Sequence, residues 1–201
     1  MREWFAQRGG KLFPHVAHVF IDGGYLRKIG DDLSVPFPDP SALAQGMVDT
    51  PTVQSWASDP TRRTNALLGR IMYYDAIPDG GVDPNLDEYW RTIELQPDMH
   101  LGFGALRGLK RKARQKGVDV QIAVDMLERS SLFDIAILVA GDADFVPVVE
   151  AVNRRGIMVV VAAELNSLAD DLRRVADRYV QITKESKMLR SLPITATVRL
   201  P

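Results

Sequence analysis

The stretch Ile135-Ala136-Ile137-Leu138-Val139-Ala140-Gly141-Asp142-Ala143-Asp144 decides how the rest of the chain is interpreted. Its first six residues are all apolar, which is typical of a strand buried on both faces of a parallel sheet. Gly141 and the two aspartates end the strand, and Asp144 stands where the N-cap of a following helix belongs. That helix is expected to bury one stripe of residues, namely Phe145, Val148, Val149 and Val152.

Similar units occur along the rest of the chain. The apolar run 16–21 predicts a strand that Asp22-Gly23-Gly24 ends before a short helix at 25–29. Further strands are expected at 71–76, within 101–106 and at 157–163, and further helices at 84–95, opened by Asp83, and at 119–129. Buried strands that alternate with helices predict an α/β fold, a Rossmann-like three-layer sandwich with a mainly parallel central sheet.

Length and proline content indicate how the chain is divided. With 201 residues, of which 46% are hydrophobic, the chain can bury one substantial core, and we expect a single domain over 1–201. Residues 31–64 are rich in Pro, Asp, Ser and Thr, which predicts an insertion with short helical pieces such as 42–47. We expect this insertion to be a lid or a partner surface, and 184–201 to be a short C-terminal extension.

The charge balance and the absence of cysteine exclude several kinds of site. Because 25 Lys and Arg stand against 26 Asp and Glu, any affinity for nucleic acid must come from local clustering of charge. Without cysteine there is no disulfide, thiolate zinc site or cysteine nucleophile. The first residues lack an apolar run of signal-peptide length, and no stretch approaches a membrane span. We therefore expect a cytoplasmic protein without a membrane partner.

Aspartates stand at the ends of two expected strands and at the start of one expected helix. Asp22 follows the first strand, and Asp142 and Asp144 follow the strand at 135–140, so these side chains should meet at one rim of the sheet. Asp119 opens a helix, and Asp125 follows within its first two turns. Carboxylates gathered in one cleft repel each other, and a divalent cation relieves that repulsion. Oxygen-only ligands favour Mg²⁺ or Mn²⁺ over zinc.

Each of these aspartates also has an ordinary structural interpretation. Asp144 and Asp119 are good helix N-caps, and capping aspartates are far more common than metal ligands. Asp22, before two glycines, fits a turn residue equally well. Asp142 is harder to explain in this way, because Asp-Ala-Asp places two charges where one cap would suffice. The convergence of separate segments on one rim favours the metal site.

A run of basic residues without any acid precedes Asp119: Arg107, Lys110, Arg111, Lys112, Arg114 and Lys116. These side chains would guide a phosphate backbone toward the acidic rim and give affinity that is independent of base sequence. A solvated loop or helix face explains the run about equally well. Our hypothesis is that these residues bind RNA.

Three ordered blocks resemble the signature blocks of NYN domains, PIN-like proteins that include LabA-type bacterial members. The blocks are Phe20-Ile21-Asp22-Gly23-Gly24-Tyr25-Leu26, Lys116-Gly117-Val118-Asp119-Val120 with Asp125-Met126-Leu127, and Gly141-Asp142-Ala143-Asp144-Phe145-Val146-Pro147. Further matches near the carboxyl end are Ser167, Leu172, Ala176-Asp177 and Val180. The resemblance spans 16–182 apart from the Pro-rich insertion.

The resemblance implies a PIN-like fold and a Mg²⁺- or Mn²⁺-dependent endoribonuclease. By motif position, the catalytic residues and metal ligands are Asp22, Asp119, Asp142 and Asp144, with Asp125 as an additional candidate ligand. The bound ion would activate a water and neutralise charge on the attacked phosphate, so no side-chain nucleophile is needed. Many relatives have Asn in place of Tyr25 and Ser in place of Ala140, so this chain lacks two polar groups that could orient a ligand or water.

Other functions fit parts of the sequence. An RNA-binding or regulatory scaffold would keep the fold and the acidic rim without chemistry, and metal-dependent turnover separates it from a nuclease. A phosphohydrolase of the haloacid dehalogenase type would use Asp142 and Asp144 on its nucleophile strand. That motif normally stands on the first strand, and too little chain follows here to supply the remaining motifs. A homodimer is also compatible, because apolar residues such as Trp56 and Leu67 fit either an interface or the core.

Overall fold

The computed structural model describes residues 14–57, 65–78, 81–104 and 116–194. Six strands form one sheet in the order β3-β2-β1-β4-β5-β6, and all neighbouring strands in it are parallel. The strands are β1 (His15–Asp22), β2 (Ala66–Asp75), β3 (Met99–Phe103), β4 (Ile135–Val139), β5 (Met158–Ala163) and β6 (Arg178–Gln181). The predicted α/β sandwich with a parallel central sheet is confirmed.

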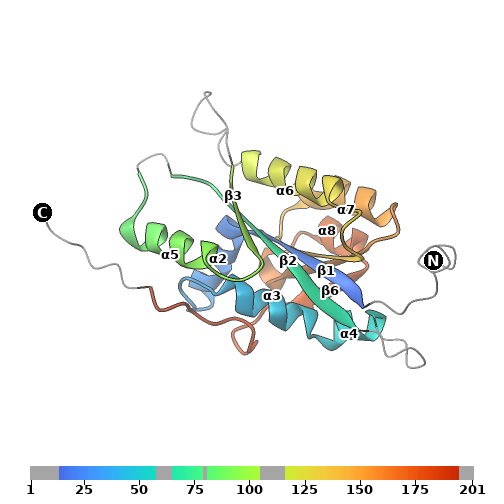
Figure 1. Cartoon of the computed structure of the whole chain (residues 1–201), viewed down its shortest axis with the longest axis horizontal. Coiled ribbons are helices and arrows are strands. Elements are labelled where there is room, and N and C mark those ends of the chain that lie inside the picture. The colour runs from blue at the N-terminus through green and yellow to red at the C-terminus, as the bar shows by residue number, and fades with distance from the viewer. Residues whose placement is uncertain (1–13, 58–64, 79–80, 105–115, 195–201) are drawn as a thin grey trace, which may run out of the picture.

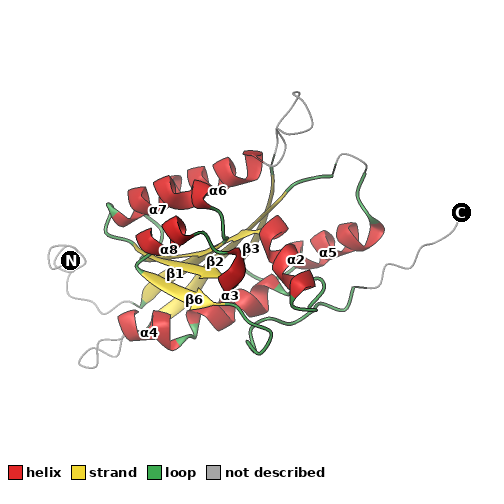
Figure 2. Cartoon of the chain, turned by 180° about the vertical axis from the view of Figure 1, so that it is seen from behind, coloured by secondary structure: helices red, strands yellow, loops and turns green. Residues whose placement is uncertain are grey.

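Helices cover both faces of the sheet (Figure 1). One face carries α6 (Lys116–Glu128), α7 (Val146–Asn153) and α8 (Asp170–Val175), and the other carries α2 (Gly23–Asp32), α3 (Pro40–Val48), α4 (Pro51–Ala57) and α5 (Pro84–Glu94). Figure 2 shows the same three layers from behind. Short 3₁₀ turns, η1 (Ala143–Phe145) and η2 (Leu165–Ser167), follow β4 and β5. None of the described helices is both long and apolar enough to cross a membrane.

The side chains of each strand divide between two hydrophobic cores, because successive residues of a strand point to opposite faces. From β1, Val19 and Ile21 enter the core under α2, α3 and α5, whereas Phe20 enters the core under α6 and α7. Every residue of β4 and β5 is buried. This double coverage is the reason why these two strands read as uninterrupted apolar runs.

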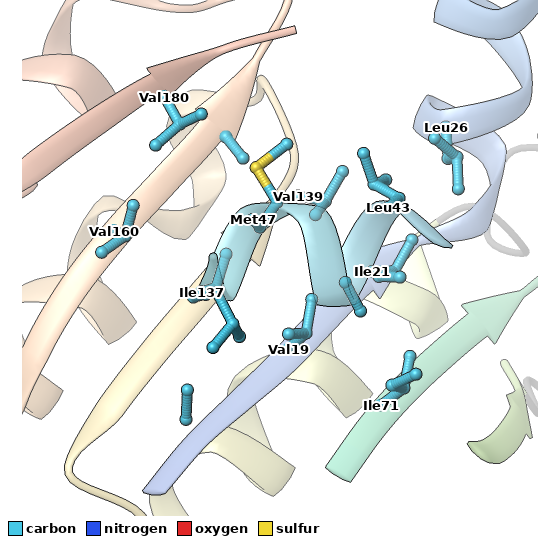
Figure 3. Packing of buried hydrophobic residues seen from close by; sticks show 14 of the residues in the cluster. Val19, Ile21, Leu26, Leu43, Met47, Ile71, Ile137, Val139, Val160 and Val180 are labelled. Carbon is cyan, nitrogen blue, oxygen red and sulfur yellow. The ribbon is translucent and has the colours of Figure 1, made fainter. Parts of the chain in front are cut away.

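The Pro-rich segment that was expected to be a lid covers the sheet instead. Leu43 and Met47 of α3 are fully buried and belong to the same core as Val19 and Ile137 (Figure 3). Pro40 occupies the first turn of α3 behind its N-cap Asp39, so proline starts a helix here. The expectation of a lid was therefore wrong for 31–57, while 58–64 lie outside the described residues.

Two helix starts differ from those expected, and both differences concern candidate site residues. Helix α6 begins at Lys116, so Asp119 lies in its first turn and is not its N-cap. After β4, Asp142 is the capping residue, since its Oδ1 accepts a hydrogen bond from the Asp144 N–H at 3.0 Å. Helix α7 begins only at Val146 and has no side-chain cap. The capping explanation of Asp119 and Asp144 was therefore wrong.

The chain after β6 returns to the α3 side of the molecule. Leu189 is buried, and Ser191 forms an isolated antiparallel bridge with Pro38. The Nε of Arg190 lies 3.3 Å from Oδ2 of Asp39. As far as it is described, the expected C-terminal extension therefore packs on the rest of the chain.

Candidate functional site

The strand order creates a switch point between β1 and β4. From β1 the chain continues outward to β2 and β3, and then crosses over to β4 and runs the other way to β5 and β6. The segments that leave β1 and β4 therefore diverge to opposite faces, α2 to one and α7 to the other. In open α/β sheets this divergence leaves a crevice at the carboxyl ends of the strands. Asp22 ends β1, and Asp142 caps the turn after β4.

A cleft with a volume of about 570 Å³ opens at this position. Four aspartates line it, each from a different segment of the chain: Asp22, Asp75, Asp119 and Asp142. Helix α2 adds Tyr25, Arg27 and Lys28 to the lining. The volume falls within the range of about 300–1,000 Å³ that is usual for small-ligand sites, so it suits a group of nucleotide size.

Backbone amides fix two of these carboxylates. Oδ1 of Asp22 accepts a hydrogen bond from the Tyr25 N–H at 3.0 Å and thereby caps α2. Asp142 is held in the same way by the N–H of Asp144. A capping role and a place in the cleft are therefore compatible in one residue. Asp144 is exposed beside Asp142 and is not part of the cleft lining.

The carboxylates of the site act on one another electrostatically. The pKa of Asp119 is raised to about 6, first by burial and then by the charges of its neighbours Asp22, Asp142 and Asp144. Burial also raises the pKa of Asp22, although two backbone N–H groups and Arg27 act in the opposite direction. Perturbed carboxyl groups in a cleft mark a candidate functional site, here one suited to a cation.

Asp119 should make the stability of the metal-free protein depend on pH. Its pKa is about 6 in the folded state against an ordinary 3.8, so its stabilising contribution is complete below 3.8 and is lost as the pH rises through 6. In EDTA, Asp119→Asn should therefore unfold at a higher temperature than the wild type at about pH 7.5, and the difference should shrink toward about pH 4. Thermal unfolding at both pH values measures this. A difference that does not change with pH would show that the predicted repulsion is absent.

Asp125 lies apart from the other candidate ligands. Its Oδ2 accepts a hydrogen bond from the Tyr74 hydroxyl at 2.5 Å, and its Oδ1 lies 3.5 Å from Nε of Arg129. Six positions along a helix correspond to about 120° around the axis, so Asp125 and Asp119 point in different directions. Asp125 is not among the residues that line the cleft.

The basic run that was expected to bind RNA falls almost entirely outside the described residues. Segment 105–115 is not described, and it contains Arg107, Lys110, Arg111, Lys112 and Arg114. Lys116 is the first residue of α6. The role of this run in RNA binding stays a prediction.

Asp75 is a residue of the cleft that sequence reasoning missed. It ends β2 as Asp22 ends β1, and it is only 1% exposed. Its Oδ2 pairs with Arg27 and accepts hydrogen bonds from Trp90 Nε1 at 2.8 Å and from the Tyr73 hydroxyl at 3.4 Å. A single acid directly after an apolar run was the available signal, the same signal that singled out Asp22.

Tyr25 connects α2 to the turn that follows β5. Its hydroxyl lies 2.8 Å from Oγ of Ser167 and accepts a hydrogen bond from the Glu164 N–H at 3.1 Å. Gly141 lies against the same turn, where a Cβ would come within 2.1 Å of the Ser167 carbonyl oxygen. Only glycine fits this approach, so the rim beside Asp142 is tightly packed. The hydrogen bonds of the Tyr25 hydroxyl help to hold the turn after β5 against this rim.

The residues that line the cleft do not form a complete set of metal ligands. Across the described ranges, no three Asp, Glu, His or Cys side chains are placed together as a ligand set for one metal ion.

A six-stranded parallel sheet in this order, with helices on both faces and aspartates at the switch point, defines an α/β protein of PIN-like fold. The chain belongs to the NYN domain family, whose sequence model matches residues 17–183. Domains of this family have the fold of PIN-like nucleases.

Known proteins that are similar to this chain include a curated relative and a solved structure. The low amplitude and bright protein LabA of Synechococcus elongatus is 26% identical over 116 residues, which cover 48% of this chain and 62% of LabA. The chain therefore spans less than two thirds of that relative. A crystal structure of a protein of unknown function from Vibrio parahaemolyticus superposes with a TM-score of 0.64 and 18% identity, covering 84% of this chain and 93% of that one. At this identity the likeness shows the fold alone.

Proposed function

We propose that this protein is a metal-dependent endoribonuclease that hydrolyses RNA phosphodiester bonds in the cleft at the β1–β4 switch point. The observation that carries the proposal is the convergence of Asp22, Asp119 and Asp142 on one cleft from three separate segments. Membership of the NYN family supports a polynucleotide substrate.

The donor set fits Mg²⁺ or Mn²⁺. The candidate ligands are all carboxylates, and Mg²⁺ usually keeps several waters and binds through only one or two carboxylates together with substrate phosphates. A site of this kind is compatible with the lack of a three-residue cage among the described residues. The candidate ligands are Asp22, Asp119 and Asp142, of which one or two would bind the ion directly and the others through its waters, and Asp144 is a further candidate. The raised pKa of Asp119, due to burial and neighbouring charges, reflects repulsion that a cation would relieve.

The residues of the cleft would orient the bound ion and the substrate, and none of them would form a covalent bond to the substrate. When bound, a divalent ion activates a water and neutralises charge on the attacked phosphate. Among the described residues, the lining of the cleft contains no Ser, Thr or Cys, and the Tyr25 hydroxyl in it is engaged with Ser167 and Glu164. Water is therefore the nucleophile that the site favours. Its oxygen forms the new bond to phosphorus as the bond to one ribose oxygen breaks. Capped turns hold Asp22 and Asp142 in place, which preorganises the site before substrate binds.

A second candidate function is RNA binding by a weak or inactive relative of the same fold. It is favoured by the incomplete ligand set among the described residues. It is also favoured by the Tyr25 hydroxyl, which is engaged with Ser167 and Glu164 where many relatives have an asparagine.

Cleavage of labelled nucleic acids distinguishes the two functions. Purified protein is incubated with single-stranded RNA, structured RNA and DNA of matched sequence, each in Mn²⁺, Mg²⁺ or EDTA, and products are resolved on a denaturing gel. We expect internal cuts in RNA with Mn²⁺ or Mg²⁺ and none in EDTA. Binding of RNA without cleavage under every condition would contradict the nuclease and support the scaffold. Cleavage of DNA alone would contradict the choice of RNA.

A further inference from the structure

Two basic residues of α2, Arg27 and Lys28, line the same cleft as the aspartates. The charge of Arg27 lowers the pKa of Asp22, so the guanidinium lies within electrostatic reach of the acidic side. Neither residue is a candidate metal ligand. A cleft that contains both carboxylates and cations can hold an anion next to a metal ion.

A buried ion pair holds the side chain of Arg27 in place. Its Nη1 pairs with Asp75, and the same nitrogen donates to the Tyr73 hydroxyl at 3.4 Å. The side chain of Asp75 is 1% exposed and that of Arg27 is 25% exposed. Arg27 is therefore partly buried by this ion pair and at the same time lines the cleft.

Asp75 itself is fully engaged. Besides Arg27, its Oδ2 accepts hydrogen bonds from Trp90 Nε1 at 2.8 Å and from the Tyr73 hydroxyl at 3.4 Å. Its Oδ1 accepts from the Ala76 N–H at 2.8 Å. A carboxylate surrounded by donors in this way is fixed in position and has little capacity left for a metal ion. Its role is to orient Arg27.

Part of the Arg27 guanidinium is left for a ligand. A guanidinium carries five N–H donors in a rigid fork. Within the described part of the chain, both hydrogen bonds of Arg27 use Nη1, and no residue accepts from Nε or Nη2. Lys28 is exposed and forms no ion pair with any residue of the described ranges. Unused cationic donors that line a cleft fit an anionic group.

We propose that Arg27 and Lys28 form a binding site for a backbone phosphate of the polynucleotide, with Asp75 as the residue that positions the guanidinium. This inference rests on the proposed function for the kind of ligand, but it requires no catalysis. The fork of Arg27 can bind two phosphate oxygens at once, whereas Lys28 supplies a point charge. Such contacts fix the register of the strand and are independent of base sequence.

Binding of a 5′-fluorescein-labelled single-stranded RNA of mixed sequence, measured by anisotropy in EDTA, tests the site without cleavage. Arg27→Lys keeps the charge beside Asp75 but loses the fork, and Lys28→Met removes an exposed charge. Each should weaken binding by about fivefold or more, and Lys28→Met should lower the slope of log affinity against log salt by about 0.7. Arg154→Met is the matched control, because Arg154 is 71% exposed at the end of α7 and outside the cleft.

The outcomes separate this site from the proposed function. If both variants bind the RNA as well as the wild type does, the site is overturned, even if the protein cleaves RNA. If the wild type does not bind in EDTA, the site is overturned as well. If the variants bind more weakly but the wild type never cleaves, the site stands and the nuclease fails. Where cleavage occurs, both variants should raise KM more than they lower kcat, which a purely structural role would not produce.

Discussion

Asp142→Asn should reduce metal-dependent cleavage of RNA by more than about 100-fold, because loss of a residue that merely orients a metal ligand already costs about 10–100-fold. The neutral amide no longer offers an anionic ligand. Its Oδ1 can still accept the hydrogen bond from the Asp144 N–H, so the turn after β4 should persist. Initial rates of cleavage in Mn²⁺, compared with the wild type, measure the effect.

The matched control for this variant is Asp49→Asn. Asp49 is the exposed C-cap residue after α3, and it does not line the cleft. The Asp49→Asn protein should cleave RNA at the wild-type rate. In EDTA the Asp142→Asn protein should unfold at no lower temperature than the wild type, because it loses one of the charges that raise the pKa of Asp119. A stable Asp142→Asn protein that still cleaves normally would remove Asp142 from the catalytic site.

The strands that build the rim could be predicted closely from sequence. Strands β4 and β5 are buried along their whole length, and the ranges expected for them, 135–140 and 157–163, each differ from the structure by one residue. Strand β2 was expected at 71–76 but begins at Ala66. Its first residues were missed because Gly69 and the exposed Arg70 interrupt the apolar run. Strand β6 buries only Val180, so no pattern indicated it. A strand could therefore be predicted from sequence where its residues are buried on both faces of the sheet.

Residues of the candidate site could be predicted only where the neighbouring sequence indicates their position. Asp22 stands at the end of one apolar strand and Asp142 shortly after another, and this position alone places them at the rim. The role of Asp75 depends on partners from separate helices, since Arg27 and Trp90 lie 48 and 15 residues away along the chain. No local pattern encodes such a contact. The lid was mispredicted for a related reason, because proline favours both loops and the first turn of a helix.

Arg27→Met should lower the free energy of unfolding by about 3–5 kcal/mol, because removing one partner leaves a buried charge without its counterion. The charge concerned is that of Asp75, whose side chain is 1% exposed. For a chain of this size the loss corresponds to a fall in Tm of about 6–20 °C. Urea unfolding followed by circular dichroism measures it. Arg27→Lys should lose less, because it keeps a positive charge beside Asp75.

A double variant tests whether the unpaired charge is the cause. Arg27→Met with Asp75→Asn removes the charge but keeps an oxygen that can accept the hydrogen bond from Trp90 Nε1. It should recover more than half of the stability lost in Arg27→Met alone. Recovery would show that the pair stabilises the fold through charge compensation, so the orientation of Arg27 at the cleft and the stability of β2 depend on the same contact. A double variant no more stable than the single one would instead show that the unpaired charge of Asp75 is not the cause of the loss. Asp75 would then have no positioning role.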